Sequence, residues 1–422
     1  MKEKELASSA RLSETVHRLR SAFPVGRSLL GFLVLIFLLG AMSSPLRMLL
    51  PVYVESELRR PPTFSSLLLI LMMGAGGVFA LLGGALASHL GQKRALLFGM
   101  ASVLLLGPLY LIRGTEWLLL VALAAGLLDG LQVVGGQSYL VAGTPRAHLG
   151  LASALFFLGS TFGSSLGSLG VGAVVERWGF ASLGPLGLAG ALVLILSTAR
   201  FLPDLRGGGQ PAPLSPREML RGYAPLCRRP GFALVMVLRF LPTCFWGAAT
   251  LLMPLLLYRL SGSGPESVLK VSTYSAASLA VAALCQLLTG RLSDRRGRGL
   301  PVLAISGLLP LCMLATALAS HSFAALFAVG IVTTAVAWSM SVNFPPLVRE
   351  LTAEHEQSRG LGLLHLLWVM GMLLGTWAGG TLVEIDPALP FALMAALNLP
   401  TAVAGYAIWR RLGLSAAPAV SG

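Results

Sequence analysis

The sequence predicts an all-α polytopic membrane protein with twelve transmembrane helices in two pseudo-symmetric six-helix halves. Its 422 residues are 55% hydrophobic and only 11% charged, whereas a soluble domain carries roughly 25% charged residues. Twelve apolar runs follow one another, and the second half repeats features of the first at a nearly constant spacing. Nucleic-acid binding is excluded, because the 31 Lys and Arg residues lie in short runs between apolar stretches rather than in one basic patch.

Each apolar run is long enough to cross a bilayer, because a hydrocarbon core about 30 Å thick needs about 20 helical residues. The first run exceeds the apolar core of a signal peptide, so we expect it to remain as an uncleaved span. The twelve expected spans are residues 29–54, 64–88, 94–112, 117–142, 149–175, 180–201, 232–258, 268–290, 300–320, 323–348, 360–383 and 389–409.

Five parts of the chain follow from these spans. Within the linker between the halves, Ser215 and Glu218 form a capping box with Pro216 at the first helical position, which predicts a short helix on the membrane surface. The parts are a cytoplasmic N-terminal segment (1–28), an N-terminal six-helix half (29–201), the cytoplasmic linker (202–231), a C-terminal six-helix half (232–409) and a cytoplasmic tail (410–422).

The basic residues predict the orientation. The side that carries both termini has 23 Lys and Arg residues, and the opposite side has 6. Basic residues are retained on the cytoplasmic side of a membrane, so both termini are expected in the cytoplasm. The 27 Arg against 4 Lys, in a chain rich in Ala, Leu and Gly, favour the cytoplasmic (inner) membrane of a bacterium.

The two halves repeat in register. Three sets of matches occur in the same order along the chain, and so many are not expected by chance. They are Pro51 with Pro254 at an offset of 203, Gly84 with Gly290 at 206, and Gly163, Gly167 and Gly172 with Gly371, Gly375 and Gly380 at 208. Parallel repeats of six helices are typical of one large class of transporters.

Two cytoplasmic loops carry related motifs. Residues 290–298 have the form G-x-L-x-D-R-x-G-R, and residues 84–94 keep both glycines, the leucine and a basic end, with Ser88 in place of the acid. This motif resembles the loop signature of the major facilitator superfamily, and the resemblance covers essentially the whole chain. It implies a secondary transporter whose two halves rock about a site near the middle of the membrane.

The same loops predict a conformational latch. Gly290 and Asp294 are four residues apart and share a helical face, where the glycine permits close approach and the acid can meet a helix N-terminus or an arginine. Because Ser88 replaces the acid, the first-half contact is expected to be weaker. Alternatively, the basic residues of these loops only set the orientation of the protein in the membrane. The expected latch residues are Gly84, Ser88, Gly91, Arg94, Gly290, Asp294, Arg295, Gly297 and Arg298.

Spans five and eleven carry small residues at helical spacing. Gly159, Gly163 and Gly167, with Gly371 and Gly375 in the second half, are expected to pack closely against neighbouring helices. Span five also resembles the glycine signature of the superfamily's drug:proton antiporters, except that Ser164 stands where that signature has proline. Residues 163–167 match G-x-S-x-G as well, but a hydrolase needs a strand-to-helix turn and a nearby histidine, so hydrolysis is not expected.

Three charged residues lie well inside spans, where each costs about 2.5–3.5 kcal/mol. Counting residues along the spans places Asp129 and Arg239 at a common level, so we expect Asp129 to pair with Arg239 or with a cationic substrate. Arg47 is expected near the outer headgroups, where a long side chain reaches water at little cost. Asp129 is the group able to take up a proton, since an arginine stays charged. A permanent structural pair is the alternative.

On spans four, seven, ten and eleven, polar and aromatic residues recur at spacings of three and four residues, so they lie on one face of each helix. These stripes are predicted to line a wet central cavity. Each aromatic residue taken singly is alternatively a packing residue. The expected substrate and proton pathway comprises Asp129, Gln132, Arg239, Thr243, Trp246, Trp338, His365, Trp368 and Arg47.

No cofactor is expected. The chain has no G-x-x-x-x-G-K-[ST] motif for ATP, and its four cysteines form no C-x-x-C pair. The expected partners are a small-molecule substrate, the lipid bilayer and protons as coupling ion, with no nucleic acid, and the protein is expected to be a monomer.

The resemblance favours proton-coupled efflux of drug-like or amphipathic compounds. A carrier of sugars or other polar metabolites is the alternative. A channel or an intramembrane hydrolase would be recognised by ion currents or by product formation.

The orientation can be tested by cysteine labelling. A single cysteine placed at Gly208, in the central loop of a variant that lacks the four native cysteines, is expected to resist a membrane-impermeant maleimide in intact cells and to react after permeabilisation. Reaction in intact cells would show that the orientation is inverted.

Overall fold

The computed structural model describes residues 27–144, 149–205, 224–352 and 357–415, and within them every regular element is a helix. Twelve helical stretches in these residues are long and apolar enough to cross a membrane, which confirms the predicted all-α, twelve-span fold. The surface helix expected at Ser215–Glu218 and the N-terminal segment lie outside the described residues.

The N-terminal half contains the first six spans. Its elements are α2 (Arg27–Met48), α3 (Leu50–Ser56), α4 (Pro62–Leu90), α5 (Gln92–Leu106), the short 3-10 helix η1 (Pro108–Tyr110), α6 (Thr115–Gly143), α7 (Leu149–Trp178), η3 (Phe180–Ser182) and α8 (Leu183–Phe201).

The C-terminal half contains the other six. Its elements are α10 (Pro230–Leu260), α11 (Pro265–Arg296), α12 (Gly299–Ala319), α13 (Phe323–Ser341), α14 (Phe344–Leu351), α15 (Gln357–Leu382), α16 (Leu389–Leu397) and α17 (Leu399–Ser415).

Three spans are divided into two helices. The first breaks at Leu49 between α2 and α3, the tenth between α13 and α14, and the twelfth between α16 and α17. Each second helix has a proline in its first two positions: Pro51, Pro345 and Pro400. Proline has no N–H to donate to the preceding turn, and its ring clashes with the carbonyl four residues earlier, so a helix tends to break there.

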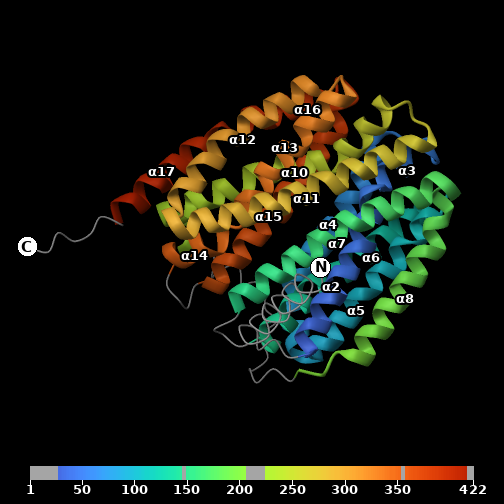
Figure 1. Ribbon diagram of the computed structural model, residues 1–422, viewed down its shortest axis with the longest axis horizontal. Coiled ribbons are helices and arrows are strands. Elements are labelled where there is room, and N and C mark those ends of the chain that lie inside the picture. The colour runs from blue at the N-terminus through green and yellow to red at the C-terminus, as the bar shows by residue number, and fades with distance from the viewer. Residues whose placement is uncertain (1–26, 145–148, 206–223, 353–356, 416–422) are drawn as a thin grey trace, which may run out of the picture.

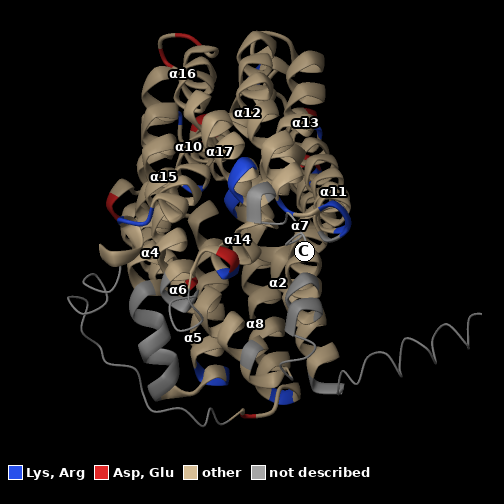
Figure 2. Ribbon diagram, turned by 90° about the vertical axis from the view of Figure 1, so that its left-hand side faces the viewer, with Lys and Arg blue, Asp and Glu red and all other residues tan. Residues whose placement is uncertain are grey.

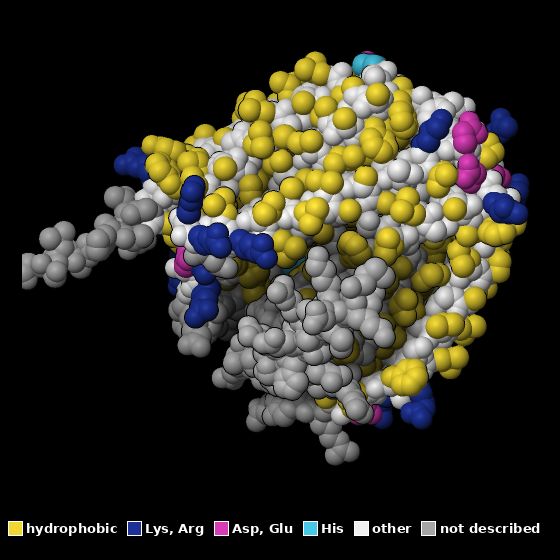
Figure 3. Space-filling view, in the orientation of Figure 1, with side chains coloured by type: hydrophobic (Ala, Val, Ile, Leu, Met, Phe, Trp, Pro, Cys, Tyr) yellow, Lys and Arg dark blue, Asp and Glu magenta, His cyan; other side chains and the backbone are white. Residues whose placement is uncertain are grey.

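The helices form two bundles that correspond to the two halves. In Figure 1 the blue to green helices α2–α8 lie together at the lower right, and the yellow to red helices lie above them. Figure 3 shows apolar side chains over most of the visible helix surface and charged side chains toward its periphery. Large apolar side chains such as Phe201, Leu318 and Val403 are more than half exposed, as expected of surfaces that face lipid.

Glycines bring helices together at equivalent places in the two halves. A Cβ on Gly163 or Gly167 of α7 would overlap the backbone of α2, and one on Gly371 or Gly375 of α15 would overlap the backbone of α10. Gly159 is looser, because its Cβ would lie 3.8 Å from the Leu33 carbonyl oxygen.

The partners of these glycines obey the same repeat. The backbone oxygens that face them belong to Phe37 and Ala41 on α2, and to Phe240 and Cys244 on α10. Both pairs are separated by 203 residues, the offset found for Pro51 and Pro254. The repeat inferred from sequence is therefore a repeat of three-dimensional contacts.

The halves meet along two helix pairs, α4 with α15 and α7 with α11. In Figure 2 the first pair lies toward the left of the molecule and the second toward the right. Ser66 Oγ donates to the Thr376 carbonyl oxygen (2.8 Å), and Ser165 Oγ donates to the Ala276 carbonyl oxygen (2.7 Å). Small side chains thus allow the two halves to approach, and the hydroxyl groups of Ser66 and Ser165 find acceptors on the facing half.

These contacts are themselves pseudo-symmetric. Gly172 of α7 packs on Ser272 of α11, and Gly380 of α15 packs on Ser66 of α4. The glycines are 208 residues apart and the serines 206, which are the offsets of the sequence repeat. The two main helix contacts between the halves are therefore two copies of one contact.

One end of the boundary is closed further. The Arg259 guanidinium group of α10 donates to Glu55 of α3, with Nε 2.7 Å from Oε1. Leu49 and Leu50 of the first span share one buried apolar cluster with Leu255 of α10. At the opposite end, no packing of comparable extent joins α6 to α14 among the described residues. The closed end is the outer side in the predicted orientation.

The glycine contacts lead to a stability prediction. Gly167→Ala is expected to lower the free energy of unfolding by about 1–3 kcal/mol, because its methyl group would overlap the α2 backbone. Gly170→Ala is the matched control on the same helix, since a Cβ there meets nothing within 4 Å. Thermal unfolding in detergent measures both, and equal melting temperatures would contradict this packing.

Candidate functional site: a central ion pair and an aromatic pocket

An ion pair joins the first and fourth spans. Arg47 of α2 binds Asp129 of α6 with both terminal nitrogens of its guanidinium group: Nη1 donates to Oδ2 at 2.9 Å, and Nη2 donates to Oδ1. Bidentate pairs of this kind are the strongest that arginine makes with a carboxylate. The expected pairing of Asp129 with Arg239 is therefore wrong for this structure, as is the expected place of Arg47 at the outer headgroups.

Helix geometry explains both corrections. The residue count along a span gives the depth of a Cα atom, but a helical side chain leans toward the N-terminus of its own helix. Because α2 and α6 are the first and fourth spans, they run in opposite directions. Arg47 therefore leans back toward the start of α2 while Asp129 leans the opposite way, and the long arginine side chain covers the remaining distance.

Small residues hold Asp129 in position. Gly126 and Gly130 lie on either side of it along α6 and pack against the α4 backbone at Met72 and Gly76. On the other side, Arg47 Nε is buried without an acceptor among the described residues. The close contact of α6 with α4 thus fixes the position of the carboxylate. The carboxylate accepts from both terminal nitrogens of Arg47 but not from Nε.

Gln132 takes a different place from the one predicted. Its side-chain oxygen accepts a hydrogen bond from Ser102 Oγ of α5 (3.1 Å), and its backbone faces Gly99. The structure thus uses Gln132 in the α5–α6 contact, one turn from the ion pair. The spacing of the residues along α6 could not reveal which neighbouring helix each would meet.

Residues from the predicted stripes on spans seven, ten and eleven line one pocket in the C-terminal half. The pocket has a volume of about 390 Å³, part of which is open to solvent. Five of its residues are predicted site residues, namely Arg239, Thr243, Trp246, Trp338 and Trp368. The others are Leu238, Pro242, Ala337, Met340, Ser341 and Phe344, so the walls come from α10, α13, α14 and α15.

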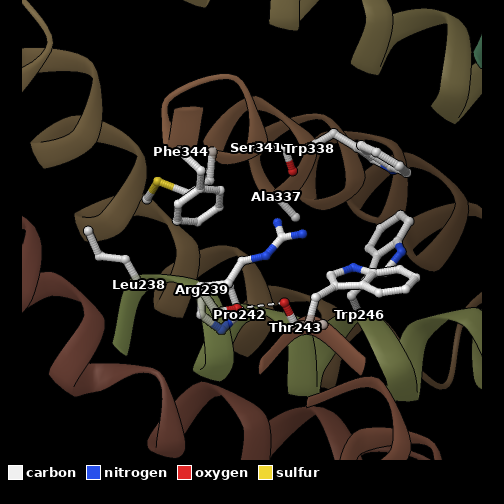
Figure 4. A pocket seen from close by; sticks show the side chains of 11 residues that line it. Leu238, Arg239, Pro242, Thr243, Trp246, Ala337, Trp338, Ser341 and Phe344 are labelled. Carbon is white, nitrogen blue, oxygen red and sulfur yellow. Dashed lines mark hydrogen bonds between the residues drawn. The ribbon is translucent and has the colours of Figure 1, made fainter. Parts of the chain in front are cut away.

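Arg239 occupies the middle of this pocket, between Phe344 on one side and the tryptophans on the other (Figure 4). Its guanidinium carbon lies 4.8 Å from the centre of the Phe344 ring, a cation–π contact. Its Nε donates to the Leu364 carbonyl oxygen at 3.4 Å. Among the described residues, no acceptor is found for its two terminal nitrogens.

The tryptophans form an ordered aromatic wall. Trp246 and Trp338 meet edge to face with ring centres 5.3 Å apart. His365 does not line the pocket and instead stacks on Trp368 at 5.6 Å. The indole N–H of Trp338 is buried without an acceptor among the described residues. The pocket therefore offers flat apolar surfaces and the two terminal nitrogens of Arg239 as hydrogen-bond donors.

Sequence reasoning missed Phe344 and the Glu55–Arg259 pair. Phe344 lies near the end of the expected span 323–348, and only the break between α13 and α14 brings its ring into the pocket. Glu55 and Arg259 lie at the ends of their spans, and their link between the halves depends on tertiary structure alone.

Several residues of the predicted latch lie in the described part of the chain. Gly91 and Gly297 both have positive φ, +88° and +80°, which glycine adopts readily, and they are 206 residues apart. Arg298 Nη1 donates to Glu350 Oε1 of α14 at 2.5 Å, whereas Arg94 and Arg295 are exposed. Gly290 lies near Val342, at 3.8 Å from a Cβ built on the glycine. The side chains of Ser88 and Asp294, and the surroundings of Gly84, are outside what the structure describes, so the latch remains a prediction.

Metal binding has no candidate site in the described part of the chain, where no three His, Cys, Asp or Glu side chains lie close enough to hold an ion.

Comparison with known proteins identifies relatives at the level of family and fold. The family model described as Major Facilitator Superfamily matches residues 32–346 and 267–419. A crystal structure of the nucleoside transporter NupG is similar with a TM-score of 0.72 at 15% identity, covering 91% of this chain and 99% of that one. The peptide transporter POT in complex with sulfate gives a TM-score of 0.74 at 14% identity, covering 92% and 95%. No curated protein sequence matches the chain.

The ion pair can be tested by a double-mutant cycle with Arg47→Gln and Asp129→Asn. We expect a coupling free energy of about 1–3 kcal/mol, because both charges lie in the middle of spans. Arg259→Gln with Glu55→Gln is the control cycle. Its side chains are almost equally exposed, 35% and 23% against 32% and 22%, but they lie at span ends, where coupling below about 1 kcal/mol is expected. Chemical denaturation in detergent measures both cycles, and equal couplings would show that the central pair is as well hydrated as the outer one.

Proposed function

Because the chain belongs to the major facilitator superfamily and is a transporter of that type, we propose that it exports a small amphipathic organic solute in exchange for protons. The proposed mechanism is alternating access across a bacterial inner membrane, by a monomer with both termini in the cytoplasm.

The pocket around Arg239 carries this proposal. Arg239 and Trp246 are 9 and 16 residues after the start of α10, or about 14 and 24 Å along a helix that crosses the whole membrane. A site at this depth can be reached from either side in turn, which is where transporters built from repeats place their substrate. Its three tryptophans and single cation suit an amphipathic solute.

The distribution of contacts between the halves supports alternating access. The halves are joined at the end marked by Glu55 and Arg259, and they pack less closely between α6 and α14. In the proposed cycle, the salt bridge and the serine contacts of α7 with α11 separate as the opposite end closes. Contacts of this size are reversible, because exposed salt bridges contribute little free energy.

The pair of Arg47 and Asp129 is the proposed site of proton coupling. In this structure the guanidinium group binds the Asp129 carboxylate. In the proposed cycle rocking separates the two, and Asp129 takes up a proton from the side that is then open. Arg47 keeps its charge throughout. The alternative is a permanent structural pair, whose loss would impair folding rather than coupling.

A carrier for polar metabolites is the second candidate. The similar structures include nucleoside and peptide transporters, whose solutes are polar, and Thr243 and Ser341 add hydroxyl groups to the pocket. Thermal-shift screening of the purified protein separates the two candidates, since a solute at 100 times its dissociation constant stabilises by about 2.7 kcal/mol.

The coupling role of Asp129 is tested with a solute found in that screen, in proteoliposomes. Asp129→Asn is expected to abolish accumulation driven by a pH gradient while counterflow exchange of the solute continues, because the amide cannot carry the proton. Glu116→Gln is the matched control, an exposed acid in the first turn of the same helix. Wild-type pH dependence in Asp129→Asn would exclude proton coupling through this residue, and loss of folding would favour the structural pair.

A further inference from the structure

The charges in the middle of the spans do not balance. Arg47 and Asp129 neutralise each other in the N-terminal half. Arg239 adds one positive charge in the C-terminal half, and none of the eleven residues that line its pocket is acidic. A charge inside a membrane span is costly unless it is paired.

The other acids with described side chains in the C-terminal half lie outside the pocket, and one of them, Glu384, is exposed in the turn after α15. Glu350 binds Arg298 on the α14 side, and Asp386 lies 3.8 Å from His321 in the loops that join other spans. Glu266 is in the first turn of α11. The structure therefore supplies Arg239 with a ring and a carbonyl oxygen, and with no described carboxylate.

The two terminal nitrogens of Arg239 have no acceptor among the described residues. Phe344 covers one face of the guanidinium group, and the Leu364 carbonyl oxygen accepts from Nε. The two terminal nitrogens remain, and these are the donors that bind a carboxylate or phosphate group side by side. In Figure 4 they point into the pocket. The buried indole N–H of Trp338, also without a described acceptor, lies in the same wall.

We infer that the transported solute is an aromatic organic anion, whose acidic group binds the terminal nitrogens of Arg239 and whose flat apolar body packs against Trp246, Trp338 and Trp368. This inference rests on the proposed function, since it takes the pocket to be the solute site. One negative charge on the solute would cancel the single positive charge of Arg239, so a monoanion fits best.

The inference is tested by binding measurements on the purified full-length protein, with a panel of aromatic carboxylates and their neutral amides. Indole-3-acetate with indole-3-acetamide is one such pair, and hexanoate is a carboxylate without a ring. Thermal shift and quenching of tryptophan fluorescence give the affinities. The aromatic carboxylates are expected to bind at least tenfold more tightly than their amides and than hexanoate.

Three variants assign this preference to Arg239. Arg239→Gln is expected to lower carboxylate affinity roughly 10- to 100-fold and to leave amide affinity unchanged, because it removes a charge-assisted hydrogen bond. Arg239→Lys keeps the charge without the paired donors, so it should retain part of the preference. Arg349→Gln is the matched control, since Arg349 is exposed on α14 outside the pocket, and it should bind like the wild type.

Amides or cations that bind as tightly as the carboxylates would overturn the inference, as would an unchanged preference in Arg239→Gln. If Arg239→Gln does not fold, the wild-type comparison and Arg239→Lys decide. These binding experiments need no gradient, so they are separate from the proposed function. Selective binding of anions without transport in proteoliposomes would contradict the transport proposal alone, and transport of uncharged solutes only would contradict the inference alone.

Discussion

Contact between helix backbones at glycine residues is the constraint on which both halves depend. Helices in lipid gain little from apolar side chains, so they associate where small residues let their backbones touch. The same contacts position the site. Gly126 and Gly130 fix α6 on α4 around Asp129, while Gly371 packs on Thr243 of α10, directly behind the aromatic pocket. The functional side chains thus lie on helices whose backbones touch a neighbouring helix at glycine residues.

The sequence predicts most of this fold and about half of the site, for physical reasons. Spans are readable because the hydrophobic thickness of a membrane sets their length, and pocket residues such as Thr243 and Trp246 are readable because helical spacing places them on one face. The partner of Asp129 is not readable in this way, since it depends on side-chain direction and helix tilt. Gln132 shares the stripe of Asp129 but binds Ser102, because α5 lies on that side.

The repeat relates the helix contacts of the two halves but not their charged residues. With the offset of 203 residues that relates α2 to α10, Arg239 corresponds to Ile36, and Arg47 corresponds to Thr250. Ile36 is buried in an apolar cluster confined to the N-terminal half. One half therefore holds a balanced ion pair and the other an unbalanced charge among aromatic rings, on equivalent helices with equivalent packing.

The guanidinium group of Arg239 meets no carboxylate among the described residues, and this has an electrical consequence. A fixed positive charge near the middle of a membrane experiences the transmembrane voltage, which is worth about 2.3 kcal/mol per 100 mV for a charge that crosses the whole field. When the voltage is negative inside, it favours the conformer in which an empty cationic pocket opens inward. That is the conformer described here if the Glu55–Arg259 end is the outer one. An anion in the pocket would cancel this charge and remove its voltage dependence. Voltage would then act on the conformational change of the empty transporter rather than on that of the transporter with bound solute.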